Sequence, residues 1–291
     1  MREANISPDF PFEPHYADVL GSRMHYVDEG EGDPILFLHG QPTSSYLWRN
    51  VIPHLVSSGR CIAPDLIGMG KSEKPDIEYR FFDHVRYLDR FTEALGLENL
   101  TLVIHDWGSA LGFHYASRHE TNVKAIAFME AILTPVVSLD TFPREMKEIF
   151  EKFRTPEVGW DLIVKQNVFI EDMLPRLILR KLSEEEMDHY RAPFRNPADR
   201  KPMWRWPNEI PVGGHPADMH EVIVSYNAWL QESKLLLHVT PGNALPPALA
   251  GWCRKHLPNL TTVDLGEGLH FIQEDMPHRI GTELATWYGG L

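Results

Sequence analysis

The sequence has few cysteines, and it contains no long apolar run. Cys61 and Cys253 are the only two cysteines in 291 residues, and they lie in a strand-like and a helix-like stretch. Two unpaired thiols in a reducing compartment are therefore expected, rather than a disulfide framework. No run approaches the length of a membrane span, and Met1–Asn5 lacks the apolar core of a secretory signal. These observations predict a cytoplasmic protein.

The sequence is also poor in cations and lacks a metal-binding pattern. Its 28 Lys and Arg residues face 41 Asp and Glu residues, a net charge of −13. Because an acidic surface repels phosphate backbones and anionic lipid, neither nucleic acid nor a membrane surface is an expected partner. Among the 15 histidines, His114 and His119 lie along one helix without a third ligand at metal spacing. We expect neither a metal nor a cofactor.

Short apolar runs alternate with amphipathic stretches of helical length, which is typical of a mostly parallel sheet with helices on both faces. The strand-like runs are Tyr16–Leu20, Arg23–Val27, Pro34–Leu38, Cys61–Pro64, Thr101–Ile104, Val123–Met129, Lys234–Val239 and Leu260–Leu265. The first two form a hairpin at Gly21-Ser22. The helical stretches are Asp83–Leu95, Gly108–Arg118, Met219–Gln231, Pro247–His256 and Phe271–Trp287. The expected fold class is therefore α/β, with eight strands.

The alternation stops between residues 133 and 214, where no strand-like run occurs. This region has many prolines, aromatic residues such as Trp204 and Trp206, and four helical patterns: Arg144–Phe153, Glu157–Lys165, Ile170–Leu177 and Ser183–Arg191. It is interpreted as a helical cap inserted into a core formed by residues 1–132 and 215–291. A cap above the strand ends would exclude water and line an apolar pocket.

The segment Ile104-His105-Asp106-Trp107-Gly108 joins an apolar strand to a helix of small residues. This is the pattern of a nucleophile elbow, with aspartate where serine is usual. A carboxylate attacks carbon without first losing a proton, so its product is an alkyl ester of the protein. That chemistry suits an sp³ carbon bearing a leaving group. Taken alone, the motif fits equally well an Asp106 that only caps the helix.

An ester intermediate needs a base that activates water and a group that orients the base. His270 follows the last strand-like run and precedes a helix, which favours it as the base over a surface histidine. Glu130 closes the apolar run Val123–Met129, where a buried carboxylate is costly unless it is paired, so it is the expected partner of His270. Asp65 is the competing carboxylate, but its sequence context favours a turn.

Gln41 and Trp107 are the candidate donors to developing negative charge. Gln41 follows the strand Pro34–Leu38, and its backbone N–H can join that of Trp107 in an oxyanion hole. The Gln41 amide and the Trp107 indole can also donate to a leaving halide. The simpler alternatives are a solvated loop for Gln41 and core packing for Trp107.

Taken together, these residues resemble those of the haloalkane dehalogenases of the α/β-hydrolase superfamily, in the subfamily whose acid is a glutamate after the sixth strand. The matching stretches are Phe37–Gly40, Pro42–Arg49, Ala63–Ser72, His105–Gly112, Gln166-Asn167, Asp188–Tyr190, Trp206–Glu209, Gly268–Phe271 and Gln273–Asp275. Three features depart from the pattern: Gln41 stands where Asn is usual, Ile104 stands where elbows prefer a small residue, and the stretch Gln231–Thr240 is shorter than usual and lacks an aromatic residue beside the turn.

The resemblance implies an α/β-hydrolase fold and hydrolysis of haloalkanes to an alcohol, a halide ion and a proton. Asp106 would be the nucleophile, His270 the base and Glu130 the acid, with Trp107 and Gln41 as halide ligands. It implies a small hydrophobic halogenated substrate and no cofactor. The implied substrate pocket is lined by Phe150, Phe169, Met173, Leu177, Pro207, Ala244, Leu245 and Leu269.

Three rival functions share parts of this pattern. Epoxide hydrolases share the aspartate but use cap tyrosines as acids, and the main candidate here is Tyr190. Luciferases that oxidise an imidazopyrazinone retain the same five-residue site, so the sequence separates them poorly from dehalogenases. A non-catalytic receptor on the same scaffold would gain nothing from halide donors beside an acid–base pair. The sequence therefore predicts hydrolytic dehalogenation.

Overall fold

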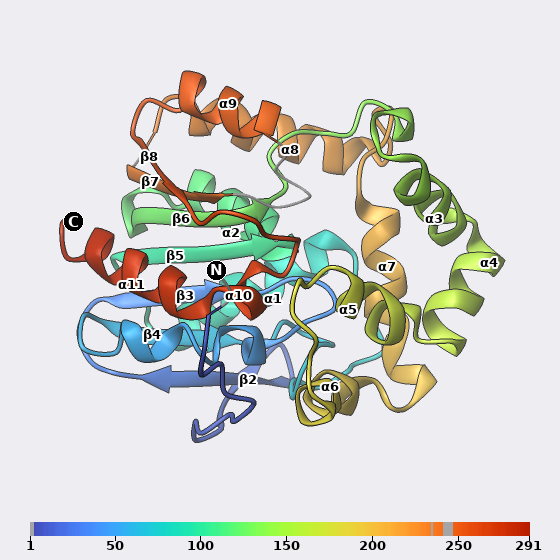
Figure 1. Ribbon diagram of the computed structural model, residues 1–291, viewed down its shortest axis with the longest axis horizontal. Helices are drawn as coiled ribbons and strands as arrows, with labels where there is room; N and C mark the ends of the chain where they lie inside the picture. Colours follow the sequence, from blue (N-terminus) through green and yellow to red (C-terminus); the bar gives the residue numbers. More distant parts are fainter. Residues whose placement is uncertain (1–2, 234, 241–246) are drawn as a thin grey trace.

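The computed structural model describes residues 3–233, 235–240 and 247–291, which form an eight-stranded sheet with helices on both sides (Figure 1). The strand order is β1-β2-β4-β3-β5-β6-β7-β8. Strands β3 to β8 run parallel to one another. Strand β2 is antiparallel to both of its neighbours, β1 and β4. The strands are β1 His15–Val19, β2 Ser22–Glu29, β3 Pro34–Leu38, β4 Arg60–Pro64, β5 Leu100–Asp106, β6 Val123–Ala131, β7 Leu235–Thr240 and β8 Leu260–Asp264. The predicted fold class is confirmed.

The central strands are buried on both faces, which explains their nearly continuous apolar sequences. Every residue of β3 is buried, as are all residues of β5 before Asp106. Helix α2 Trp107–Arg118 contacts both α1 Phe81–Ala94 and α8 Ala217–Leu230, and α9 Pro247–His256 contacts β8. Helix α11 Pro277–Tyr288 lies in front of the strands in Figure 1. Because β3, β5 and β6 are parallel neighbours, their carboxyl ends lie together at one edge of the sheet.

The helical segment between β6 and α8 lies beyond this edge of the sheet (Figure 1). Its two ends are joined, because Val136 N donates to Pro211 O and Gly213 N donates to Val136 O, each at 3.0 Å. Its helices are α3 Arg144–Arg154, α4 Pro156–Trp160, α5 Leu174–Arg176, α6 Glu184–Arg191 and α7 Lys201–Glu209. We refer to residues 133–214 as the inserted segment.

Two predicted helices of the inserted segment begin or end in a wider turn. The pattern over Glu157–Lys165 becomes α4 followed by a π-helix at Asp161–Lys165. The pattern over Ile170–Leu177 becomes a π-helix at Phe169–Met173 followed by α5. The prediction missed α7 entirely, because Pro202 and Pro207 argue against a helix. Pro202 lies in the first turn, where the missing N–H costs nothing, and Pro207 lies near the end.

The predicted single helix Phe271–Trp287 is wrong. It is divided into α10 Ile272–Asp275 and α11, with Met276 between them in a non-helical conformation. The residue before a proline is biased away from helical geometry, and Pro277 follows Met276 directly. The break matters because the short helix α10 begins only two residues after His270. In the part of the chain that the structure describes, no helix is both long and apolar enough to cross a membrane.

Candidate active site

Asp106 occupies the sharp turn between β5 and α2. Its backbone has φ 50° and ψ −128°, a conformation that non-glycine residues rarely adopt and that is found most often at functional sites. The turn is closely packed, since a Cβ atom on Gly40 would lie 2.1 Å from Asp106 Oδ1. Gly112 is the residue of α2 that packs against the bulky Ile104. A Cβ atom added to Gly112 would lie 2.7 Å from Ile104 Cγ2. This elbow therefore accommodates an isoleucine because the opposing residue has no side chain.

Two backbone amides face the Asp106 carboxylate. Gln41 N donates to Asp106 Oδ1 at 2.6 Å, and the N–H of Trp107 also bonds the carboxylate. Gln41 and Trp107 are both buried. Burial opposes ionisation of Asp106, but the hydrogen bond and charge of His270, with the Trp107 N–H, hold the pKa of Asp106 below its ordinary value. The carboxylate is therefore ionised and oriented before a substrate arrives.

His270 lies between the two carboxylates. Its Nε2 is 3.4 Å from Asp106 Oδ2, and its Nδ1–H donates to Glu130 Oε2 at 3.1 Å. Burial alone would lower the pKa of His270, but its hydrogen bonds to Asp106 and Glu130, and their charges, raise it above the ordinary value. In the free protein the neighbouring carboxyl groups therefore favour the protonated form of His270.

Glu130 reaches His270 because of an irregularity in β6. Along β5 and β6 the paired residues are His105 with Met129 and then Asp106 with Ala131, so Glu130 is an extra residue. Its φ of 47° marks a bulge, which redirects a side chain at the end of a strand. The sequence identified Glu130 as a paired carboxylate but carried no sign of the bulge.

The backbone around His270 is held by its neighbours. The buried His105 donates from Nε2 to the carbonyl oxygen of His270 at 2.8 Å, and Phe271 N donates to Leu177 O of the inserted segment at 3.1 Å. Asp65, the competing carboxylate, bonds His25, Ser45 N and Lys71 N instead. Although burial opposes its ionisation, these bonds, that of His25 first, lower its pKa to about 2. Asp65 anchors a turn.

The sequence did not reveal what holds the Trp107 ring in place. Trp206 of α7 stacks on Trp107 with ring centroids 4.5 Å apart, and His84 of α1 stacks on Trp206 at 4.2 Å. Burial lowers the pKa of His84 to about 3, so its ring is neutral. The Trp206-Pro207 pair was visible as a motif, but only the fold places it against Trp107. The inserted segment therefore holds the ring of Trp107, a candidate halide donor, through the stacked ring of Trp206.

The candidate pocket residues lie mostly on the inserted segment. Phe169, Met173 and Leu177 are partly buried against the core, and the Phe169 ring is 4.8 Å from that of Phe153. The Phe150 ring lies 6.2 Å from the same Phe153 ring. Pro207 is buried beside Trp206, and Leu269 is partly buried beside His270. Ala244 and Leu245 lie outside the described residues. Within the described ranges, no three His, Cys, Asp or Glu side chains are grouped to hold a metal ion.

Comparisons with known proteins identify the family. Residues 33–277 match the model of the alpha/beta hydrolase fold family. A haloalkane dehalogenase of Mesorhizobium japonicum is 47% identical over 275 residues, 92% of this chain and 89% of that protein. One of Sphingobium indicum is 47% identical over 287 residues, 95% of this chain and 96% of that protein. The crystal structure of haloalkane dehalogenase DbeA from Bradyrhizobium elkani matches with a TM-score of 0.93 at 45% identity, covering 96% and 98% of the two chains. The chain therefore belongs to the haloalkane dehalogenases of the α/β-hydrolase superfamily.

Proposed function

We propose that this protein hydrolyses small apolar haloalkanes through a covalent ester at Asp106. The observation that carries the proposal is an ionised carboxylate at the elbow, bonded through Oδ1 to Gln41 N and flanked through Oδ2 by His270. Oδ2 attacks the carbon that bears the halogen, so a C–O bond forms while the C–halogen bond breaks. The halide leaves with the bonding electron pair, and the Trp107 indole N–H and the Gln41 amide stabilise it.

The second step hydrolyses the ester. His270 removes a proton from water as the water oxygen attacks the carbonyl carbon of the Asp106 ester, and Glu130 stabilises the imidazolium that forms. Negative charge then develops on Oδ1, to which the N–H of Gln41 already donates, and the N–H of Trp107 also bonds this carboxyl group. Collapse of this intermediate breaks the bond between the carbonyl carbon and Oδ2, and Oδ2 leaves in the alcohol together with the second proton of the attacking water. Asp106 returns as a carboxylate, and the proton on His270 is lost to solvent.

We infer that residues 133–214 act as a cap over this site. Its two ends meet at the bridge between Val136 and Val212, which supports the proposed boundaries with the core segments 1–132 and 215–291. Trp206 packs on Trp107, and Leu177 bonds the residue after His270. The candidate pocket residues of the cap are apolar, which fits a hydrophobic substrate.

Incubation with 1-bromobutane or 1,2-dibromoethane tests the proposal, with bromide and alcohol expected in equal amounts. Epoxide hydrolysis is disfavoured because the hydroxyl of Tyr190 is buried and donates to Glu274, so it does not face the site as an acid. Luciferase chemistry on an imidazopyrazinone would yield light and no bromide. Absence of bromide with both substrates would contradict the proposal.

We also propose that the enzyme works in a reducing compartment and binds only small molecules. Cys61 and Cys253 are both buried and form no disulfide, which supports a reducing compartment such as the cytoplasm. The net charge of −13 supports a small-molecule substrate rather than nucleic acid or a membrane surface.

Gln41→Leu is expected to slow bromide release roughly a hundredfold, from a loss of about 3 kcal/mol of charge stabilisation. Gln41 is buried, and its amide oxygen has no hydrogen-bond partner among the described residues. A half-turn of the amide would place its NH₂ donor at that point. Rapid-quench measurement of bromide in a single turnover checks the rate, and Gln41→Asn, which keeps an amide, should remain active. If the leucine variant releases bromide at the native rate, the Gln41 amide does not stabilise the leaving halide.

The two steps should also differ in pH dependence. Alkylation converts Asp106 to a neutral ester and removes one of the two anions that raise the pKa of His270, so that pKa falls and a neutral base becomes available. Ester hydrolysis is then lost as pH falls through this new pKa. Bromide release needs only ionised Asp106, whose pKa is lowered, so it should persist. Intact-protein mass after rapid quenching should show more adduct at about pH 5 than at about pH 8. Parallel loss of both steps would argue against this assignment.

A further inference from the structure

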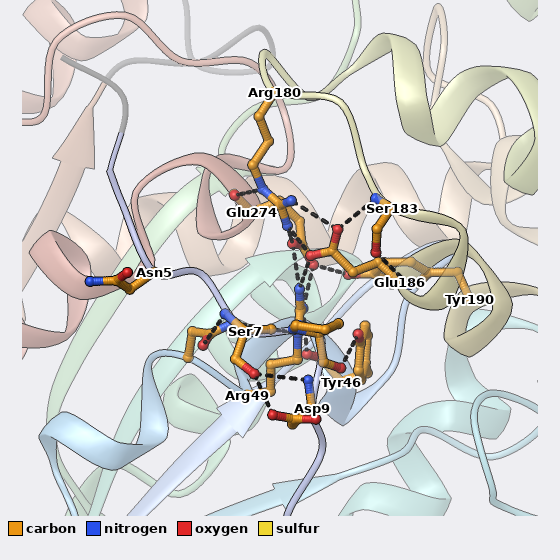
Figure 2. Close-up of polar contacts among 12 residues, drawn as sticks. Asn5, Ser7, Asp9, Tyr46, Arg49, Arg180, Ser183, Glu186, Tyr190 and Glu274 are labelled. Atoms are coloured by element: carbon orange, nitrogen blue, oxygen red, sulfur yellow. Dashed lines mark hydrogen bonds and ion pairs between the residues drawn. The ribbon is translucent and has the colours of Figure 1, made fainter.

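Two arginines, two glutamates and a tyrosine form a buried cluster between the core and the inserted segment (Figure 2). We define the arginine–glutamate cluster as Arg49, Arg180, Glu186, Tyr190 and Glu274. Arg49 donates to Glu274 Oε1 at 2.6 Å and to Glu186 Oε1 at 2.8 Å. Arg180 pairs with the same two carboxylates, and the hydroxyl of Tyr190 donates to Glu274. The cluster balances two positive charges against two negative ones.

The cluster joins three parts of the chain that are distant in sequence. Arg49 follows a short helix, Ser45–Trp48, after the Gln41 turn, and Glu274 lies on α10. Arg180 lies in the loop between α5 and α6, and Glu186 and Tyr190 lie on α6. The side chain of Glu274 is fully buried, and burial opposes its ionisation, but the charges of Arg49 and Arg180 hold its pKa below the ordinary value. Buried ions persist only when they are paired this completely.

Arg180 holds the segment that follows His270 through more than one contact. Its Nε–H donates to the backbone carbonyl of Glu274, and its guanidinium bonds the Glu274 carboxylate. The backbone N–H groups of Leu179 and Arg180 donate to the Asp275 carboxylate at 2.9 and 2.8 Å. Together with the bond from Phe271 N to Leu177 O, these contacts tie α10 to the loop 177–180 of the inserted segment.

From these contacts we propose that Arg180 is a positioning residue for His270, so that the arginine–glutamate cluster sets the rate of ester hydrolysis. This inference rests on the proposed role of His270 as the base. His270 begins the segment that Arg180 holds, and it must direct Nε2 at a water molecule poised over the ester carbonyl. Small displacements of a reacting group are costly in rate. Bromide release uses Asp106, Trp107 and Gln41, none of which contacts the cluster, so that step should be insensitive to it.

Arg180→Met is the test variant, because methionine keeps much of the length and apolar contact of arginine while it removes every donor. Arg49 would remain as the single cation beside Glu274 and Glu186, so Arg180→Met should lower stability, and thermal unfolding of the variant is measured before its kinetics. Arg191→Met is the matched control: Arg191 pairs with Glu171 and Glu184 within the inserted segment and contacts nothing on α10. Arg180→Lys keeps the charge but not the bonds to both carboxylates and the Glu274 carbonyl, so its behaviour should be intermediate.

The experiment follows bromide and 1-butanol separately after rapid mixing of each variant with 1-bromobutane. In Arg180→Met, alcohol formation should slow about tenfold while the bromide burst stays within about twofold, so the alkyl-enzyme accumulates. Arg191→Met should match the native protein in both steps. Equal slowing of both steps in Arg180→Met would indicate a merely structural role, and two unchanged steps would indicate no role; either result overturns the inference. If Arg180→Met does not fold, the same comparison of steps in Arg180→Lys decides the question.

The native protein in the same experiment separates this inference from the proposed function. If native protein releases no bromide or forms no adduct at Asp106, the proposed function itself fails. If it shows a burst followed by hydrolysis while the Arg180 variants behave like it, only the positioning role fails.

Discussion

Asp106→Ala is expected to leave no measurable dehalogenation, a loss on the order of 10⁴-fold or more, as for other covalent nucleophiles. The variant keeps the donors of Gln41 and Trp107 but has no atom that can form the C–O bond. Bromide release from 1-bromobutane measures the loss. Asp188→Ala is the matched control, because its carboxylate is exposed on α6 and has only a long contact to Arg191. Equal activity in the two variants would rule out the nucleophile.

Isotope labelling distinguishes a covalent ester from direct attack by water. In a single turnover in ¹⁸O-water, the label should enter the Asp106 carboxylate, because water attacks the ester carbonyl and not the alkyl carbon. Peptide mass spectrometry of the segment that contains Asp106 measures the incorporation. Label found only in the alcohol of the first turnover would mean that Asp106 is not the attacking group.

His270→Phe is expected to release about one bromide per protein molecule and then stop. Oδ2 of Asp106 can still attack, but no base activates water, so the alkyl-enzyme persists and is visible by intact-protein mass. His15→Phe serves as the control, because His15 is exposed on β1, far along the chain from the site. Loss of the burst itself would mean that the positive charge of His270 is also needed to hold Asp106 for the first step.

Much of the fold was predictable because local patterns report burial. The buried run Pro34–Leu38 gave β3 with the correct bounds, and the helix predicted over Gly108–Arg118 differs from α2 by one residue. The family resemblance was confirmed, and the structure brings His270 within hydrogen-bonding or ion-pair distance of both Asp106 and Glu130. Their catalytic roles remain predictions.

Contacts between distant residues were not predictable. Arg49 and Glu274 are 225 residues apart, and the sequence around either residue does not indicate which residue it pairs with. The same is true of the stack of His84 and Trp206, which needs α1 and α7 to be placed first. The break before α11 was missed for a different reason: the amphipathic period continues across Pro277, so the hydrophobic pattern concealed a stop that the proline itself signals.

Because Glu130 lies in a bulge, the geometry of the site depends on the number of residues at the end of β6. Between Met129 and Ala131 the chain of β6 is one residue longer than the neighbouring stretch of β5. A deletion of one residue there would restore a regular ladder and remove the local geometry that directs a carboxylate at His270, while leaving Asp106, His270, Gln41 and Trp107 in the sequence. A substitution at Glu130 and a deletion of one residue from β6 would therefore remove the same carboxylate by different routes, the first leaving the bulge in place and the second removing it.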